Sequence, residues 1–363
     1  MTTGRPEGKD RGRGSHEWPE QVLSTPASLA DRAGMRQVAA RAGVAMSSVS
    51  RVLSGHPDVS KAMRARVTAA VEELGYEPNM LGQMLRNGAT QTVGFVVGDI
   101  SNPLLAQIAL GAETALRAAG YAMLLTNSVN DASLDATHIK LFQQRRVDGL
   151  LLSLADETSN ETLTALGRTP TPSVLIDREL KLQDRPSAVV SDHHAGITAA
   201  VNHLISIGHQ RIALIAGSPH VRPTRERVAA IEEATATHRK VLCQVRSGAF
   251  TEAHGAAATR ELLNTRRPPT ALIAGGNQIL VGVLRELATQ SLTIPDDISV
   301  VTCDDVPLAE FLRPALATIR RDPAAMGTAA AQLLLARLGG GSPETTVLPT
   351  VFSPTGSCAP PRH

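Results

Sequence analysis

The chain has 363 residues, enough for two or three domains, and its 42% hydrophobic content is sufficient for a substantial core. It has neither a secretory leader nor an apolar run of the roughly 18 residues that a membrane helix needs, which indicates a cytoplasmic protein. Its three cysteines do not have the spacing of a metal site, so we expect no bound metal. The formal net charge is only +2, so any contact with nucleic acid must be local.

Residues 1–33 are rich in Gly, Pro, Arg, Glu and Ser and show no periodicity, which predicts a disordered tail. Two short helices follow over residues 35–54, MRQVAARAGVAMSSVSRVLS, and are joined at Gly43, whose permissive backbone suits a tight turn. Apolar side chains recur at helical spacing in both helices, so the two can pack together. This arrangement predicts a helix-turn-helix.

The second helix leaves a set of small polar side chains, a methionine and an arginine facing outward: Met46, Ser47, Ser48, Ser50 and Arg51. Such a helix can enter a major groove, where serine hydroxyls contact bases or phosphates and arginine contacts guanine. We therefore expect this helix to bind DNA. An ordinary helical hairpin with a solvated face is the alternative.

A third helix is predicted from Ser60, as its N-cap, to about Leu74, with Gly75 ending it. Its first turns carry Lys61, Arg64 and Arg66. Residues 34–87 hold seven basic and four acidic side chains, a net charge of +3. This local positive charge suits phosphate contacts.

From about Gln91, short apolar runs alternate with amphipathic stretches: VGFVVGDI, a helix near 103–119, YAMLLTNS, a helix near 131–145, DGLLLSL and SVLIDRE. The same order recurs from His209: RIALIAGS, a helix near 224–237, VLCQVRSG, a helix near 252–263, ALIAGG, a helix near 278–289 and ISVVTCDD. Buried strands between helices predict parallel sheets. The repetition predicts two α/β subdomains that face each other across a cleft.

Ligands in such sheets gather at the carboxyl ends of strands, which draws attention to the loops there. These loops provide one cation, several carboxylate and amide groups and one aromatic ring, a set suited to a sugar or related polar metabolite. Helix capping, turn formation and core packing are the structural alternatives. The candidates are Asp99, Ser101 and Asn102 after the first strand, Arg227 opening a helix after IAGSP, Phe250 after VLCQVRSG, Asn277 after ALIAGG and Asp304 after ISVVTC.

The segments VAARAGVAMSSVSRVLSG and VSKAMRARVTAAVEELGYEPN resemble the amino-terminal domain of the LacI/GalR (lactose-repressor) family of bacterial transcriptional regulators. The resemblance extends from about Met35 to Pro361, through VGFVVGDISNP, RRVDGLLL, VLIDRE, HLISIGHQRIALIAG, PDDISVVTCDDV and LPTVFSPTGSCAPP. It implies an all-α helix-turn-helix DNA-binding domain followed by an α/β core like that of periplasmic binding proteins, with two parallel-sheet subdomains. The domains expected are a tail at 1–33, the DNA-binding domain at 34–78, a hinge helix and linker at 79–90, and an effector-binding and dimerisation domain at 91–363.

The resemblance also implies that Asn79–Asn87 forms a hinge helix in the minor groove, with Leu85 wedging a central base step. Asn79 can cap this helix after Pro78 breaks the preceding one. Gly82 stands where the family usually has alanine and weakens the helix by roughly 1 kcal/mol. A flexible linker is the alternative.

By the same resemblance, Arg227, Phe250, Asn277 and Asp304 align with effector-contact positions. The chain departs from the common pattern at four places: Gln278 replaces an acid, Ala230-Ile231 and Thr302-Cys303 replace glycine-aromatic pairs, and Leu104-Leu105 replaces an aromatic pair. These departures leave open a smaller or less ring-like effector than a hexose, or a cleft that has lost its ligand response.

The sequence shows no nucleophile elbow, zinc-protease motif, dinucleotide fingerprint or P-loop. His193 and His194 are adjacent, so their side chains should diverge rather than share a metal, and His209 before a strand suits a structural hydrogen bond. We therefore expect a repressor without cofactor or enzymatic activity, bound to a palindromic operator as a homodimer and modulated by a small effector. A sugar-binding protein or sugar-processing enzyme without specific DNA regulation is the alternative.

Overall fold

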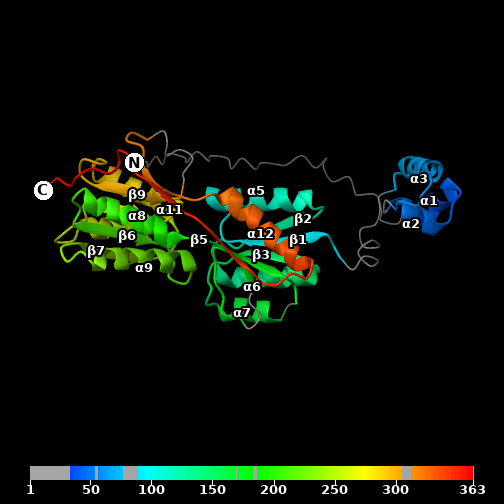
Figure 1. Cartoon of the computed structure of the whole chain (residues 1–363), viewed down its shortest axis with the longest axis horizontal. Coiled ribbons are helices and arrows are strands. Elements are labelled where there is room, and N and C mark those ends of the chain that lie inside the picture. The colour runs from blue at the N-terminus through cyan, green and yellow to red at the C-terminus, as the bar shows by residue number, and fades with distance from the viewer. Residues whose placement is uncertain are drawn as a thin grey trace, which may run out of the picture. The chain divides into compact units, whose positions relative to one another are not determined.

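The computed structural model describes residues 33–53, 56–76, 89–168, 170–182, 186–304 and 312–362 (Figure 1). The chain divides into two compact units, residues 1–87 and 88–363. The predicted hinge helix, with Asn79 and Leu85, lies outside the described residues, as does the predicted tail except for its last residue. Among the described residues, no helix is long and apolar enough to cross a membrane.

The first unit contains the three predicted helices: α1 (Met35–Ala42), α2 (Met46–Leu53) and α3 (Lys61–Leu74). Gly43 ends α1 in a left-handed conformation with φ of 64°. The Ser60 hydroxyl accepts the Met63 amide at 3.3 Å at the start of α3, and Gly75 ends that helix. All three helices contribute to one apolar core: Val38, Ala39, Ala42, Val49, Val52, Val67, Ala70 and Tyr76.

The second unit contains two six-stranded sheets, each between two pairs of helices. The first subdomain has the strand order β11-β5-β4-β3-β1-β2, with all neighbours parallel. Its strands are β1 (Thr92–Val97), β2 (Ala122–Asn127), β3 (Gly149–Ser153), β4 (Ser173–Ile176), β5 (Ser187–Ser191) and β11 (Thr345–Leu348). One face is covered by α5 (Pro103–Ala118) and α12 (Pro323–Leu338), and the other by α6 (Ala132–Gln144) and α7 (Asn160–Gly167).

The second subdomain repeats this plan with the order β12-β10-β9-β8-β6-β7. Its strands are β6 (Arg211–Ala216), β7 (Leu242–Ser247), β8 (Ala271–Ala274), β9 (Ser299–Cys303), β10 (Ala317–Arg320) and β12 (Val351–Ser353). The helices α8 (His193–Ser206) and α9 (Arg222–Ala236) cover one face, and α10 (Glu252–Leu263) and α11 (Asn277–Thr289) cover the other. The predicted pair of parallel-strand-rich α/β subdomains is confirmed.

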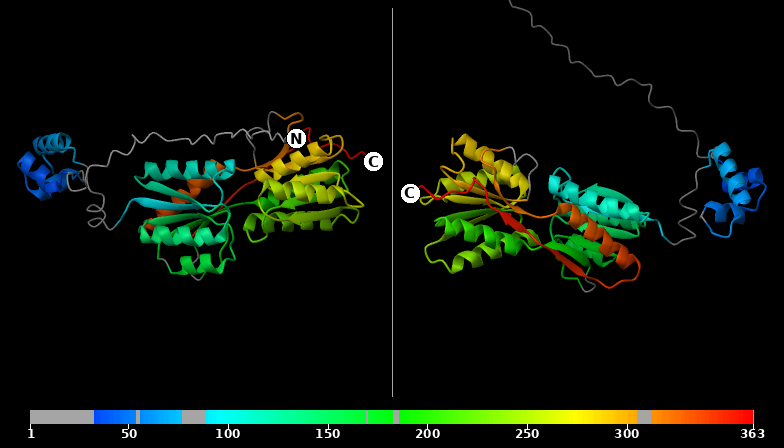
Figure 2. Two further views of the ribbon diagram at one scale, coloured as in Figure 1. Left: turned by 180° about the vertical axis from the view of Figure 1, so that it is seen from behind. Right: turned by 45° about the horizontal axis from the view of Figure 1, so that its top comes forward.

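The chain passes between the subdomains three times: after β5, after β10, and between β11 and β12. Figure 2 shows the last passage, in red, running from one sheet to the other. Because β11 runs parallel to its neighbours, the chain leaves the first sheet at the carboxyl ends of the strands. It then enters the second sheet at the carboxyl ends of the parallel strands there. Consequently β12 lies antiparallel to β10, the one antiparallel pairing among the described strands.

Helices α5 and α12 approach each other so closely that glycine is needed at both contact points. A β-carbon on Gly111 would lie 2.2 Å from the Ala324 carbonyl oxygen, and one on Gly327 would lie 2.0 Å from that of Ile108. Real β-carbons do not approach backbone atoms so closely, because interiors are already packed at crystal density. These two glycines therefore set the distance between the helices.

Candidate functional site

The predicted DNA-contacting face of α2 is at the surface of the helical unit. Ser47 and Arg51 are exposed and Met46 is 48% exposed, whereas Ser48 and Ser50 are half-buried. Val49 and Val52 of the same helix are buried in the core. Packing of the apolar side of α2 therefore fixes which of its side chains are presented.

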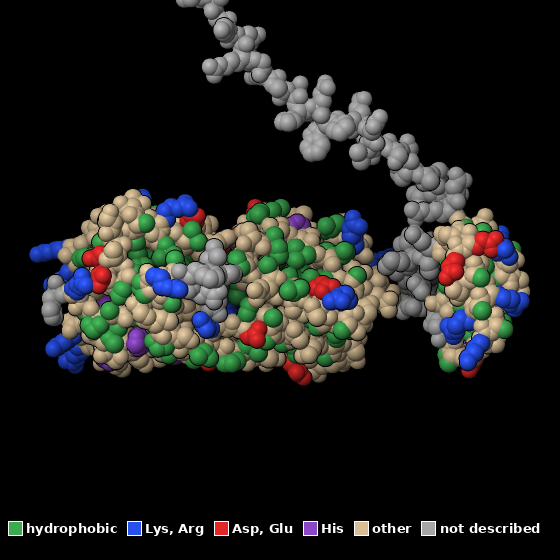
Figure 3. Space-filling view, turned by 90° about the horizontal axis from the view of Figure 1, so that it is seen from above, with side chains coloured by type: hydrophobic (Ala, Val, Ile, Leu, Met, Phe, Trp, Pro, Cys, Tyr) green, Lys and Arg blue, Asp and Glu red, His purple; other side chains and the backbone are tan. Residues whose placement is uncertain are grey.

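The basic residues of this unit differ in what they contact. Lys61 and Arg66 of α3 are exposed. Figure 3 shows Lys and Arg side chains at the surface of the helical unit. Arg64 instead donates to the His56 carbonyl at 3.1 Å and so fastens the loop before α3. Arg41 pairs with Glu73 at 2.9 Å, a surface ion pair of small energetic weight. Lys61 and Arg66 remain the better placed for phosphates.

The predicted effector residues come together where the carboxyl ends of both sheets meet. Five of them line a cavity of about 60 Å³: Asp99, Asn102, Arg227, Phe250 and Asp304. Asn277, the first residue of α11, lies beside the cavity and donates to the Asn102 side chain at 3.2 Å. One positional expectation is wrong: Arg227 lies in the second turn of α9, because Pro223 already sits in the first turn of that helix.

Polar side chains from the two subdomains bond directly across the cleft. Gln278 Nε2 donates to Asp99 Oδ2 at 2.7 Å. Burial raises the pKa of the Asp99 carboxyl, but the hydrogen bonds from Ser101 and Gln278 outweigh it, so that the pKa lies below its usual value. The Gln278 side-chain amide donates to the Asp99 carboxylate, whereas an ionised acidic side chain at position 278 would repel that carboxylate. This departure from the family pattern thus makes a bond across the cleft.

A second contact between the subdomains is ionic. Glu157, in the loop after β3, accepts the backbone amide of Arg222 at 2.7 Å and the Arg225 guanidinium at 2.7 Å. Val221, the N-cap of α9, makes no side-chain capping bond. Glu157 of the first subdomain therefore caps a helix of the second.

The structure adds a buried ionic cluster that sequence reasoning did not identify. Arg321, at the second passage of the chain, has a side chain only 6% exposed. Its Nε donates to Asp304 Oδ1 at 2.5 Å and its NH2 to Asp304 Oδ2 at 3.2 Å. Its NH1 donates to Asp177 and, at 3.3 Å, to the Ser191 hydroxyl. One guanidinium thus joins a carboxylate of each subdomain.

Both carboxyls stay ionised in this cluster. Burial raises the pKa of each, but His193 and Arg321 beside Asp177, and Arg321 and Arg227 beside Asp304, hold both pKa values below the usual range. Burial lowers the pKa of His193 to about 4 despite the neighbouring Asp177. The neutral ring therefore donates from Nε2 to Asp177 over 2.9 Å.

Two buried polar atoms at the cavity have no hydrogen-bond partner within the described protein. Arg227 donates from NH1 to the Gly275 carbonyl at 2.6 Å, but its Nε is unpaired. Asn277 Oδ1 is also unpaired. Both residues are at least 95% buried. An unpaired donor and an unpaired acceptor near the same cavity suit a hydroxylated ligand, since a hydroxyl group can both accept and donate a hydrogen bond.

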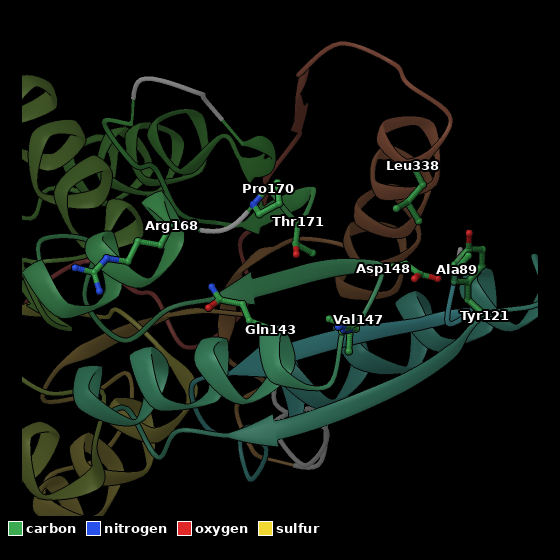
Figure 4. A pocket seen from close by; sticks show the side chains of 10 residues that line it. Ala89, Tyr121, Gln143, Val147, Asp148, Arg168, Pro170, Thr171 and Leu338 are labelled. Atoms are coloured by element: carbon green, nitrogen blue, oxygen red, sulfur yellow. The ribbon is translucent and has the colours of Figure 1, made fainter. Parts of the chain in front are cut away.

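A larger hollow of about 580 Å³ lies elsewhere in the first subdomain (Figure 4). Its walls come from segments that precede strands, including Ala89 before β1, Tyr121 before β2, Asp148 before β3 and Thr171 before β4. It is therefore at the amino ends of the parallel strands. Ligands of open α/β sheets bind at the carboxyl ends, where the smaller cavity lies.

Three histidines make the kind of contact that the sequence predicted for them: His193, His194 and His209. His193 and His194 diverge, since His194 contacts Glu233 at 2.8 Å while His193 contacts Asp177. The ring nitrogens of His209 contact the hydroxyls of Thr270 at 2.8 Å and Ser299 at 3.1 Å, which is a structural role.

A helix-turn-helix unit followed by two α/β subdomains around a polar cleft defines a ligand-responsive transcriptional regulator. Residues 34–79 match the bacterial regulatory proteins of the lacI family, and residues 201–358 match the periplasmic binding protein-like domain. The chain is 33% identical over 313 residues to the ribose operon repressor of Escherichia coli (strain K12), with 84% of this chain and 93% of the relative covered. The chain belongs to the lacI family of bacterial regulatory proteins.

Solved structures agree with this assignment. The Lac repressor dimer bound to operator and the anti-inducer ONPF matches with a TM-score of 0.78 and 25% identity, covering 90% of this chain and 99% of that one. A LacI family transcriptional regulator from Enterococcus faecium with bound ribose matches with a TM-score of 0.66 and 26% identity, covering 75% and 100%. The named relatives are regulators rather than enzymes.

Proposed function

We propose that this regulator is a repressor that binds a palindromic operator through α2 as a homodimer. The observation that carries the proposal is the polar face of α2, with Ser47 and Arg51 exposed beside Met46. Arginine can contact guanine through two hydrogen bonds, and serine can contact either bases or phosphates. Ser48 and Ser50 complete the proposed surface, and Asn79 and Leu85 are proposed to act in the minor groove.

A homodimer fits both the operator and the surface of the second unit. Two recognition helices related by a two-fold axis match the two halves of a palindrome. Helices α5 and α11 each expose a large apolar side chain, Leu110 at 65% and Val281 at 41%. Such side chains can be covered at the apolar centre of an interface between subunits. The Lac repressor is a dimer on its operator in the matched structure.

We also propose that a small hydroxylated effector binds between the subdomains and changes operator affinity. The support comes from the unpaired Arg227 Nε and Asn277 Oδ1 beside the cavity. The other proposed contacts are Asp99, Asn102, Phe250 and Asp304. An effector can shift DNA affinity only through its differential affinity for two arrangements of the subdomains. The cross-cleft bonds would differ between those arrangements. No enzymatic activity is proposed.

The operator can be identified by selecting bound duplexes from a randomised pool at fixed salt. A near-palindrome is expected. Arg51→Ala should lower affinity and relax the preference at one position of each half-site, by about 1–3 kcal/mol of discrimination. Arg66→Ala is the matched control: it removes the same charge from α3 and should weaken binding to all sequences alike. An unchanged sequence preference in the Arg51 variant would show that Arg51 does not contact a base, and unchanged affinity as well would remove it from the interface.

A further inference from the structure

Two aspartates occupy equivalent positions in the two subdomains. Asp177 follows β4 and Asp304 follows β9, the third strands in the matching orders of the two sheets. Both residues have left-handed backbones, with φ of 53° and 74°. The Asp177 amide donates to Val189 of β5 at 2.7 Å, and the Asp304 amide donates to Ile319 of β10 at 3.0 Å. The repeated fold thus presents two carboxylates beside β5 and β10, the strands after which the chain passes between the subdomains.

Carboxylates in such positions are suited to the vicinal hydroxyls of a sugar, but here every one of their oxygens already accepts at least one hydrogen bond. Asp177 accepts from His193, from Arg321 and, at 3.1 Å, from the Ser191 amide. Asp304 accepts from Arg321 through both oxygens. Four of the five guanidinium N–H groups of Arg321 are used in these bonds and the one to the Ser191 hydroxyl.

The space that remains is small. The cavity of about 60 Å³ compares with about 300 Å³ at the lower end of ordinary small-molecule pockets. Arg321 itself forms part of its wall. A pentose or hexose ring therefore has neither an oxygen of Asp177 or Asp304 without a hydrogen bond nor sufficient room while the Arg321 guanidinium stays between the two subdomains.

We propose that Arg321 is a specificity-determining residue, which occupies the sugar-hydroxyl position between Asp177 and Asp304 and so excludes pentoses and hexoses from the cleft. The cleft then selects a smaller hydroxylated ligand, held at Arg227 and Asn277. This inference rests on the proposed effector function. It separates the chain from its relative named ribose operon repressor, despite their 33% identity.

The test uses D-ribose as the probe and the full chain, with binding measured by calorimetry. Arg321→Gln shortens the side chain and removes its charge, and we expect it to bind D-ribose at least about tenfold more tightly than wild type, equivalent to about 1.4 kcal/mol. Arg320→Gln makes the same change at an exposed neighbouring side chain and should leave ribose binding at the wild-type level. D-Ribose should also change the operator affinity of the Arg321 variant, which a purely structural role of Arg321 would not produce.

Two results would overturn the inference. In the first, wild type already binds D-ribose and the Arg321→Gln variant binds it no more tightly, so the guanidinium is not in the way. In the second, neither wild type nor a cooperatively folded Arg321→Gln protein binds D-ribose, so removal of the guanidinium does not admit the sugar. Should that variant not fold, the double variant Arg321→Gln/Asp177→Asn replaces the ion pair with two amides and is tested in the same way. Operator binding without sugar is measured for every protein, so a failure of the DNA-binding proposal is seen separately in wild type.

Discussion

Glu157 and Arg222 lie in different subdomains, yet the Glu157 carboxylate accepts the Arg222 backbone amide at 2.7 Å and caps helix α9. The same carboxylate also accepts the Arg225 side chain at 2.7 Å. Since the cap belongs to the other subdomain, the stability of α9 depends on how the subdomains are placed.

Replacing Glu157 by alanine should lower the free energy of unfolding by about 2 kcal/mol, since a helix cap and a buried acceptor are both lost. Urea unfolding measures this change. Glu179→Ala is the control, because Glu179 is 63% exposed and only 4.0 Å from Arg225. Its effect should stay within about 0.5 kcal/mol. Equal losses for the two variants would contradict the capping role.

Gly111→Ala should destabilise the first subdomain, because the added β-carbon would meet the Ala324 carbonyl oxygen at 2.2 Å. We expect a loss of about 1–3 kcal/mol from overpacking. Gly167→Ala makes the same change at the end of α7, where no atom lies within 4 Å of the new β-carbon. That control should be neutral or slightly stabilising. Thermal unfolding of both variants compares them, and a neutral Gly111 variant would show that α5 and α12 can separate without cost.

Stability should fall as the pH falls from about 6.5 to about 4, because burial lowers the pKa of both His209 and His193 to about 4. The unfolded chain binds a proton at His209 over this range while the folded chain does not, so acid favours unfolding. The contribution of His209 to the free energy of unfolding is fully present above the pKa that this residue has in the unfolded chain, about 6.5. The His209 contribution is on the order of 3 kcal/mol, since its pKa lies about 2.5 units below the usual 6.5 and one pKa unit is worth about 1.4 kcal/mol.

Urea unfolding at several pH values checks this dependence. His209→Asn should reduce the slope between pH 6.5 and 4 and leave the part that comes from His193, although it also costs stability at neutral pH. His238→Asn, at an exposed position, is the matched control and should keep the wild-type slope. A wild-type slope in the His209 variant would assign the acid sensitivity to other groups.

Asp148 should anchor the chain just before β1. Its carboxylate accepts the Thr90 amide at 2.8 Å, the Thr90 hydroxyl at 3.1 Å and the Gln91 amide at 2.7 Å. Asp148→Ala removes these acceptors, so hydrogen exchange at residues 90 and 91 should quicken at least about tenfold, for a local loss of about 1.4 kcal/mol. Asp156→Ala removes a similar pair of bonds to Thr158 and should leave residues 90 and 91 unchanged. Unaltered exchange in the Asp148 variant would contradict the anchoring role.

Much of the fold could be predicted from local patterns. Gly43, Ser60 and Gly75 mark the helix boundaries of the first unit through backbone freedom and capping, both of which are local properties. Runs such as RIALIAGS identify buried strands because parallel strands are apolar on both faces. The antiparallel β12 was not predicted, because its direction depends on where the chain leaves β11 rather than on its own residues.

The candidate site could be predicted only in part. Each of five candidates lies within about five residues after the end of a strand, so their common location follows from sheet topology: Asp99, Asn102, Phe250, Asn277 and Asp304. Asp177 also ends a strand, in VLID, and comparison of the two halves would have paired it with Asp304. Arg321 carries no such signal, since it lies between β10 and α12 and its partners are 17 and 144 residues away in the sequence. Side-chain reach across the cleft is visible only in three dimensions.

The order of the strands along the chain has a consequence for synthesis on the ribosome. The first sheet is closed by α12 and β11 and the second by β12, and these elements occupy residues 323–353. Neither core can be completed until residues 323–353 have emerged, even though β1 and β6 are made much earlier. Both sheets are therefore completed through contacts between distant parts of the chain, and until then the apolar strands already made need protection from aggregation.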